Sequence, residues 1–288
     1  MSARRPTRSS GATQIPDVLP PSRTLTVRAA DGTPLHTQVF GPPHGYPIVL
    51  THGFVCAIRA WAYQIADLAG DYRVIAFDHR GHGRSGVPRR GAYSLNHLAA
   101  DLDSVLDATL APRERAVVAG HSMGGITIAA WSDRYRHKVR RRTDAVALIN
   151  TTTGDLVRKV KLLSVPRELS PVRVLAGRSL VNTFGGFPLP GAARALSRHV
   201  ISTLAVAADA DPSATRLVYE LFTQTSAAGR TPISQSRRIA RTAPNVVGLV
   251  ELPGGHCSML ERHQEVNSHL RALAESVTRH VRDRRISS

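Results

Sequence analysis

The chain has 288 residues, of which 42% are hydrophobic and 20% are charged, an ordinary composition for a globular protein with a packed core. No run of about 18 consecutive apolar residues is present, which argues against a transmembrane helix, and two cysteines exclude a disulfide framework, so we expect a reduced, cytoplasmic protein. The net charge of +17 is most simply that of a solvated basic face, and weak peripheral attraction to anionic membranes is the alternative; no nucleic-acid-binding motif accompanies it, so we expect no nucleic-acid partner.

The first half of the chain begins with an Arg-, Ser- and Pro-rich segment over residues 1–22, which lacks the apolar stretch of a secretory signal and predicts a disordered basic leader. Short apolar runs and helical periodicity then alternate. Strands are predicted at residues 25–28, 35–40, 47–51, 73–77, 115–119 and 144–150, and helices at residues 57–68, 95–110 and 125–135. Because the inner strands are wholly apolar and alternate with helices, the pattern predicts an α/β fold with a mostly parallel, doubly wound sheet.

The alternation stops after the sixth predicted strand. Residues 151–229 contain helical pieces at 192–208 and 214–224, separated from the core by a Gly- and Pro-rich break, which together predict an inserted helical lid. The core pattern resumes with a helix at 232–241, a strand at 246–252 and a long helix at 264–281. We therefore divide the chain into a core of residues 23–150 and 230–282, the lid between them, and a basic tail of residues 283–288.

One five-residue sequence, Gly120-His121-Ser122-Met123-Gly124, lies directly between the predicted strand at 115–119 and the predicted helix at 125–135. Strand, G-x-S-x-G and helix together form the context of a nucleophile elbow, a turn so tight that the serine backbone is strained and glycines are needed on either side. The pattern predicts that Ser122 is a catalytic nucleophile whose hydroxyl lies at the carboxyl end of its strand.

A serine hydroxyl is a weak nucleophile and needs a base within hydrogen-bond reach. His256 follows the last predicted strand in the sequence Pro253-Gly254-Gly255-His256, so it emerges at the same edge of the sheet as Ser122. We predict that His256 is the base. No C-x-x-C or H-E-x-x-H spacing is present, so no metal site is predicted.

Acyl transfer also needs N–H donors that are already in place for the oxyanion of the intermediate. Met123, the residue after the nucleophile, supplies one such backbone N–H group. The second is expected from the loop after the strand at 47–51, where His52-Gly53-Phe54 stands and the glycine permits close approach of the backbone. We therefore predict an oxyanion site formed by the backbone N–H groups of Phe54 and Met123.

Four motifs in this order resemble the α/β-hydrolase fold family, in its serine esterase, lipase and peroxidase-like branch. They are Leu50-Thr51-His52-Gly53-Phe54, Phe77-Asp78-His79-Arg80-Gly81-His82-Gly83-Arg84-Ser85, Gly120-His121-Ser122-Met123-Gly124-Gly125 and Pro253-Gly254-Gly255-His256. The resemblance implies a central sheet, a variable lid after the sixth strand, no cofactor and a serine–acid–histidine triad. Ser122 also distinguishes the chain from epoxide hydrolases and haloalkane dehalogenases, which resemble this family but carry an aspartate at the elbow.

The triad acid is the part of this pattern that the sequence lacks. Family members usually carry it after a strand that follows the lid, but residues 225–230 hold neither a strand nor a carboxylate, so we interpret a segment near Gly229 as lost. Two substitutes stay open: Asp155, just beyond the sixth strand, and Asp211, which would otherwise cap a helix that begins at Pro212. The acid is therefore unresolved.

Together these residues predict a serine hydrolase that cleaves a lipophilic carboxylic ester, so that a small-molecule ester or a lipid is the expected substrate. The missing acid strand leaves an alternative from another class, a non-catalytic or decayed hydrolase-fold protein. A peroxidase-like activity without a cofactor is a third hypothesis within the same fold. The sequence makes no prediction of the oligomeric state.

Overall fold

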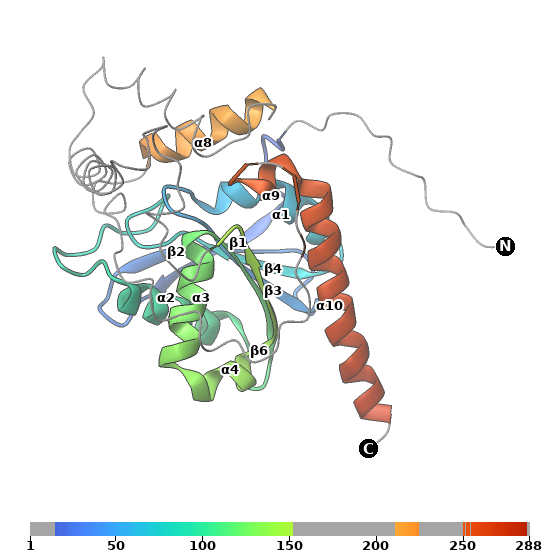
Figure 1. Cartoon of the computed structure of the whole chain (residues 1–288). Coiled ribbons are helices and arrows are strands. Elements are labelled where there is room, and N and C mark those ends of the chain that lie inside the picture. Colours follow the sequence, from blue (N-terminus) through green and yellow to red (C-terminus); the bar gives the residue numbers. More distant parts are fainter. Residues whose placement is uncertain (1–14, 152–210, 225–249, 251, 254, 287–288) are drawn as a thin grey trace, which may run out of the picture.

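The computed structural model describes residues 15–151, 211–224, 250, 252–253 and 255–286 (Figure 1). Most of the predicted lid lies outside these residues, as do the leader up to residue 14, the predicted helix at 232–241 and most of the predicted strand at 246–252. The predicted lid helix at 214–224 is described, and it runs as α8 from Pro212–Gln224.

The described strands form one mixed sheet in the order β1-β2-β4-β3-β5-β6. The edge pair β1 and β2 is an antiparallel hairpin, and β2 also runs antiparallel to β4. The remaining strands β4, β3, β5 and β6 are mutually parallel, which confirms the predicted α/β sheet. The strands span Ser22–Arg28 (β1), Pro34–Phe40 (β2), Pro47–Thr51 (β3), Arg73–Phe77 (β4), Ala116–His121 (β5) and Thr143–Ile149 (β6).

Helices cover both faces of the sheet (Figure 1). Alternate residues of β3 explain why: Ile48 and Leu50 join the core beneath one set of helices, whereas Val49 joins the core on the opposite face. The first face is covered by η1 (Ile58–Trp61), α1 (Ala62–Leu68), α9 (Ser258–Glu261) and α10 (His263–Ile286), and the second by α2 (Leu95–Thr109) and α3 (Met123–Arg134). A strand buried on both sides has to be apolar throughout, which is why these strands read as continuous hydrophobic runs.

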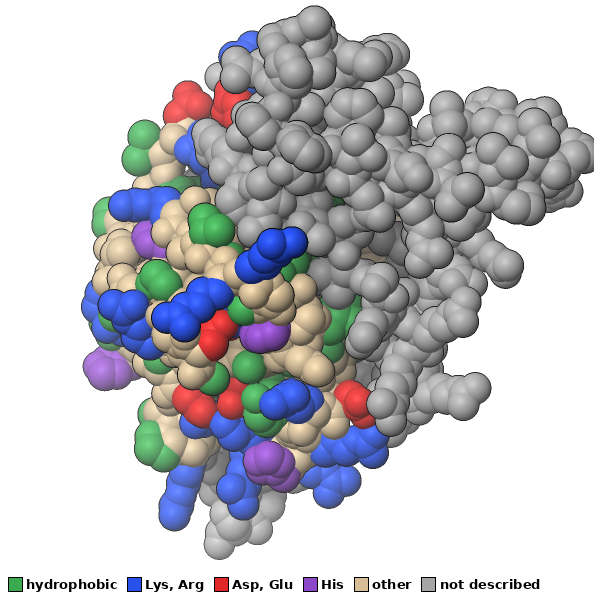
Figure 2. Space-filling view, turned by 90° about the vertical axis from the view of Figure 1, so that its left-hand side faces the viewer, with side chains coloured by type: hydrophobic (Ala, Val, Ile, Leu, Met, Phe, Trp, Pro, Cys, Tyr) green, Lys and Arg blue, Asp and Glu red, His purple; other side chains and the backbone are tan. Residues whose placement is uncertain are grey.

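Helix α4 (Arg136–Arg142) was not predicted, because its sequence RHKVRRR carries no apolar stripe. Ion pairs with α2 stabilise it instead: the Lys138 Nζ lies 2.8 Å from carboxylate oxygens of both Asp103 and Asp107, and Arg142 also pairs with Asp107 at 2.8 Å. Lys and Arg side chains are spread over the described part of the face in Figure 2, among acidic and hydrophobic ones. None of the described helices combines the length and the hydropathy needed to cross a bilayer.

The parallel strands all end at one edge of the sheet, and each is followed there by a polar residue. His52 follows β3, Asp78 follows β4, Ser122 follows β5 and Asn150 follows β6. In an open α/β sheet this carboxyl edge is where ligands bind and catalytic groups gather. The sheet therefore brings together residues that lie up to 98 positions apart in the sequence (Asn150 and His52) before any loop is considered.

Candidate active site

Ser122 lies in the turn between β5 and α3 with a strained backbone, at φ 50° and ψ −114°. The turn is possible because two glycines allow close contact between its arms: a Cβ on Gly120 would lie 2.6 Å from the carbonyl carbon of Gly124. A Cβ on Gly124 would lie 2.1 Å from the carbonyl oxygen of Thr51 in β3. The backbone of the elbow is thus packed directly against the strand that leads into the predicted oxyanion loop.

His256 meets Ser122 across 134 positions of sequence, with its Nε2 2.8 Å from the serine Oγ. The ring is half-buried, and burial lowers the pKa of His256 below its usual value, partly opposed by the charge of Glu261. A lowered pKa keeps the imidazole neutral near neutral pH, so its Nε2 can accept the proton of the serine hydroxyl. The two residues predicted as nucleophile and base are therefore in hydrogen-bond contact.

The backbone around His256 is anchored to the ends of two strands. His121, the last residue of β5, lies with its Nε2 2.7 Å from the carbonyl oxygen of His256, so this nitrogen carries the proton and donates it. The Asn150 Nδ2 donates to the carbonyl oxygen of Gly255 at 3.3 Å, and the Ser258 hydroxyl donates to the Asn150 Oδ1. No pattern in the sequence assigns this role to His121 or Asn150, although each stands at the carboxyl end of an apolar strand run.

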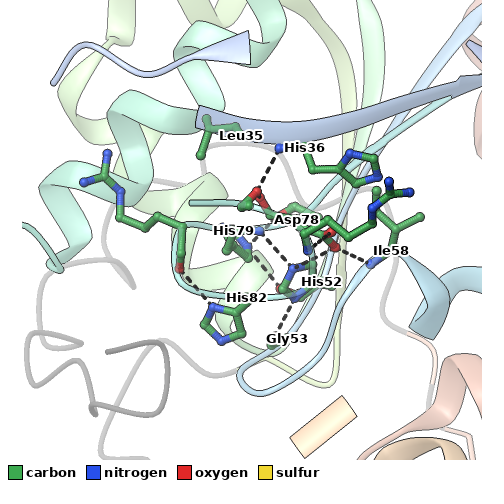
Figure 3. A network of polar contacts seen from close by, with 12 residues as sticks. Leu35, His36, His52, Gly53, Ile58, Asp78, His79 and His82 are labelled. Carbon is green, nitrogen blue, oxygen red and sulfur yellow. Dashed lines mark hydrogen bonds and ion pairs between the residues drawn. The ribbon is translucent and has the colours of Figure 1, made fainter. Parts of the chain in front are cut away.

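The oxyanion loop is oriented by His52, which is fully buried. The backbone N–H of His79 donates to the His52 Nε2 at 3.0 Å, so the proton of this ring sits on Nδ1, which lies 2.7 Å from the carbonyl oxygen of Gly53 (Figure 3). Because the C=O and N–H of a trans peptide point in opposite directions, this bond turns the N–H of Phe54 away from His52. Neither this N–H nor that of Met123 donates a hydrogen bond to any residue in the described part of the chain.

Asp78 and His82 hold the next part of the same loop (Figure 3). The Asp78 carboxylate accepts hydrogen bonds from the backbone N–H groups of Ile58 at 2.8 Å and Arg84 at 2.9 Å, and burial raises its pKa to about 6. The Nε2 of His82 accepts from the backbone N–H of Val55, a residue with a strained φ of 51°. In the sequence this segment is only a motif of resemblance, and its role as a support for the loop is visible only once β3 and β4 are paired.

Of the two candidate acids, only Asp211 is described, and its hydrogen bonds are made away from His256. Asp155 lies outside the described residues, and Asp211 is exposed, where its Oδ1 accepts from the backbone N–H of Ser213 at 2.7 Å at the start of α8. This is the capping role that the sequence suggested as the alternative for Asp211. Among the residues that the structure describes, no Asp or Glu forms an ion pair with the His256 ring.

An apolar cluster lies beside the predicted oxyanion residues. Met123 belongs to it together with Phe54 and Tyr93, and the Tyr93 hydroxyl lies 3.8 Å from the Met123 sulfur. The other members come from helices α2 and α3: Leu95, Leu98, Ile126 and Ala130. Within the described ranges, no three His, Cys, Asp or Glu side chains are grouped so that they could hold a metal ion.

Comparison with known proteins gives consistent matches. The family described as alpha/beta hydrolase fold matches residues 46–211. The chain is 38% identical over 110 residues to a non-heme chloroperoxidase of Streptomyces lividans, covering 38% of this chain and 39% of that protein. It is 41% identical over 113 residues to epoxide hydrolase B of Mycobacterium tuberculosis, covering 38% of this chain and 31% of that protein. These matches span well under half the length of either relative.

Among solved structures, the enol-lactonase of Burkholderia xenovorans aligns with a TM-score of 0.63 at 25% sequence identity. The alignment covers 87% of this chain and 99% of the enol-lactonase. The likeness to this structure therefore extends well beyond the segment that the family match covers.

Proposed function

The chain belongs to the alpha/beta hydrolase fold family, and on that premise we propose that it is a serine hydrolase that cleaves a carboxylic ester through an acyl-enzyme. The observation that carries this proposal is the 2.8 Å contact between the Ser122 Oγ and the His256 Nε2 at a strained strand-to-helix turn. A hydroxyl and a neutral imidazole in this contact are the two groups that nucleophilic acyl transfer requires.

In the proposed reaction, Ser122 attacks the ester carbonyl carbon while His256 takes up the hydroxyl proton. The carbonyl oxygen becomes an oxyanion and accepts hydrogen bonds from the backbone N–H groups of Phe54 and Met123. The tetrahedral intermediate collapses to an acyl-serine, and the alcohol leaves with the proton from His256. Water then attacks the acyl group with His256 as base, and the carboxylic acid is released.

A lipophilic ester is the substrate class that the site favours. Met123, one of the two proposed oxyanion donors, belongs to the apolar cluster with Phe54 and Tyr93, so an acyl or alkyl chain held there would lie against apolar side chains. Hydrolysis of a series of p-nitrophenyl esters tests this point. We expect kcat/KM to rise with acyl-chain length from acetate to hexanoate, and a steady fall along the series would contradict a lipophilic site.

A fluorophosphonate probe tests the proposal as a whole, because it reacts covalently only with an activated serine. We expect the protein to be labelled, and Ser122→Ala to abolish the labelling. The matched control is Ser132→Ala, which removes the hydroxyl of a half-buried serine on helix α3. This variant should be labelled like the natural protein. A folded protein that is never labelled would refute the proposal.

A lack of labelling would favour the second candidate function, that of a non-catalytic protein with a hydrolase fold. The observation that supports this candidate is the absence, among the described residues, of an Asp or Glu paired with the His256 ring. The match to a chloroperoxidase supports a further activity at the same serine, a peroxidase-like reaction without a cofactor. A halogenation assay with hydrogen peroxide, run on the natural chain and on Ser122→Ala, tests that activity.

A further inference from the structure

Glu261, the last residue of the short helix α9, binds the backbone on both sides of His256. Its Oε2 accepts a hydrogen bond from the N–H of Gly255 at 2.9 Å, and its Oε1 accepts one from the N–H of Cys257 at 3.1 Å. A single carboxylate thus holds the two peptide groups that flank the histidine. Hydrogen bonds to a charged acceptor are about twice as strong as those between neutral groups, and the paired contact also fixes direction.

The contacts of this loop divide into two sets. Its carbonyl groups accept hydrogen bonds from neutral side chains at the strand ends, that of Gly255 from Asn150 and that of His256 from His121. Its N–H groups are held by Glu261. The loop is therefore fixed to the sheet on one side and to α9 on the other, and Glu261 is the charged member of the set.

The described groups that face the His256 ring are few. Ser122 contacts the Nε2, and the His121 ring lies with its centroid 4.9 Å away and is neutral, because burial lowers its pKa to about 3. Burial raises the pKa of the Cys257 thiol, so that group is neutral too. The carboxylate of Glu261 raises the pKa of His256, against the effect of burial. Its charge thus favours the imidazolium that forms when the serine proton is transferred.

We propose that Glu261 is the positioning residue of His256, holding the ring against Ser122 through the peptides on both sides, with its negative charge beside the same loop. This inference rests on the proposed function, in which His256 is the base. The role of Glu261 differs from that of a triad acid in one respect. Glu261 acts through the backbone on either side of His256, and no contact with the ring nitrogens is required. A conventional acid would stand in the segment near Gly229 that we interpret as lost.

The test uses Glu261→Gln, which keeps the shape and removes the charge, and Glu261→Asp, which keeps the charge and shortens the reach. Glu265→Gln is the matched control, because Glu265 is exposed four residues further on in α10. Two readouts are needed: kcat and KM for a p-nitrophenyl ester across pH, and the pKa of His256 from the NMR titration of its ring. The NMR readout does not depend on catalysis.

We expect Glu261→Gln to lower kcat about tenfold or more with KM within about twofold, because ring position and charge matter most in the transition state. The midpoint of the acid limb in the pH dependence of its kcat and the pKa of His256 measured by NMR should both fall by about 0.5 pH unit or more, since a favourable charge has been removed. Glu261→Asp should leave the pKa of His256 close to that of the natural chain and still lower kcat. Glu265→Gln should have the kcat and the His256 pKa of the natural chain.

Two outcomes would overturn the inference, and a third would overturn only the function on which it rests. Glu261→Gln with the kcat and His256 pKa of the control would show that Glu261 does neither task. A lower unfolding midpoint with an unchanged His256 pKa and acid limb would show a purely structural residue. A natural chain that the fluorophosphonate probe never labels would refute the proposed function instead, and the NMR titration would still decide whether Glu261 acts on His256.

Discussion

Gly124→Ala tests the close approach on which the elbow depends. The added Cβ would lie 2.1 Å from the Thr51 carbonyl oxygen and 2.8 Å from that of His52, and both atoms are backbone. Neither can rotate away, and β3 is held between two neighbouring strands, so α3 has to move by about 1 Å to restore ordinary contact.

The magnitude follows from two opposing effects. Overpacking of this kind costs about 1–3 kcal/mol, and contact with two consecutive backbone carbonyl groups places this site at the upper end. The higher helix propensity of alanine returns up to about 1 kcal/mol. We therefore expect a net loss of about 2 kcal/mol in the free energy of unfolding, measured by urea denaturation and followed by far-ultraviolet circular dichroism.

The same displacement should slow the chemistry, because α3 carries the Met123 N–H and begins directly after Ser122. A shift of about 1 Å in a reacting group can cost about a hundredfold in rate, so fluorophosphonate labelling should slow by roughly that factor. Gly70→Ala is the control: a Cβ there would meet nothing within 4 Å, and we expect a change within about 0.5 kcal/mol. Gly124→Ala with the natural midpoint and labelling rate would refute the reasoning.

Three further results are expected. The Arg80 Nη2 lies 2.5 Å from the Asp101 Oδ1, and both side chains are at most 1% exposed, so Arg80→Met should destabilise the fold by about 3–5 kcal/mol at pH 7 in urea denaturation. Burial raises the pKa of Asp101 to about 6, so the loss should be smaller at pH 5, where the carboxyl takes up a proton; an equal loss at both pH values would contradict this. Burial raises the pKa of Asp78 from 3.8 to about 6, so the folded state binds its proton more tightly, and the stability that this group contributes below about pH 4 is lost as the pH rises through about 6. The free-energy difference between the natural chain and Asp78→Asn should shrink accordingly from pH 4 to pH 7, and a constant difference would speak against a raised pKa. The charge of +17 predicts sedimentation with anionic vesicles at about 50 mM salt that is lost at about 300 mM, and binding at neither salt concentration would remove that hypothesis.

Local patterns in the sequence were sufficient for the core elements. Continuous apolar runs located β3, β4, β5 and β6 to within about two residues. For β3, β4 and β5 the reason is that a strand covered on both faces must be apolar along its whole length, whereas β6 exposes Val146 and Leu148 on one face. The elbow was equally local, since strand, glycines and helix are adjacent in the chain. Helix α4 was missed for the opposite reason: its stability comes from carboxylates of α2, some 30 residues earlier.

Sequence patterns predicted which residues carry the proposed chemistry, because Ser122, His256, Gly53 and Gly120 stand in patterns whose backbone requirements are local. How these residues are held depends on the packing of distant segments. The contact of Ser122 with His256 spans 134 positions, and the bonds of Glu261 to the backbone beside His256 arise in a short helix that no periodicity announced. The physical reason is that periodicity records which face of an element is buried, whereas a site at the carboxyl edge of a sheet depends on which strands pair and how the loops beyond them meet.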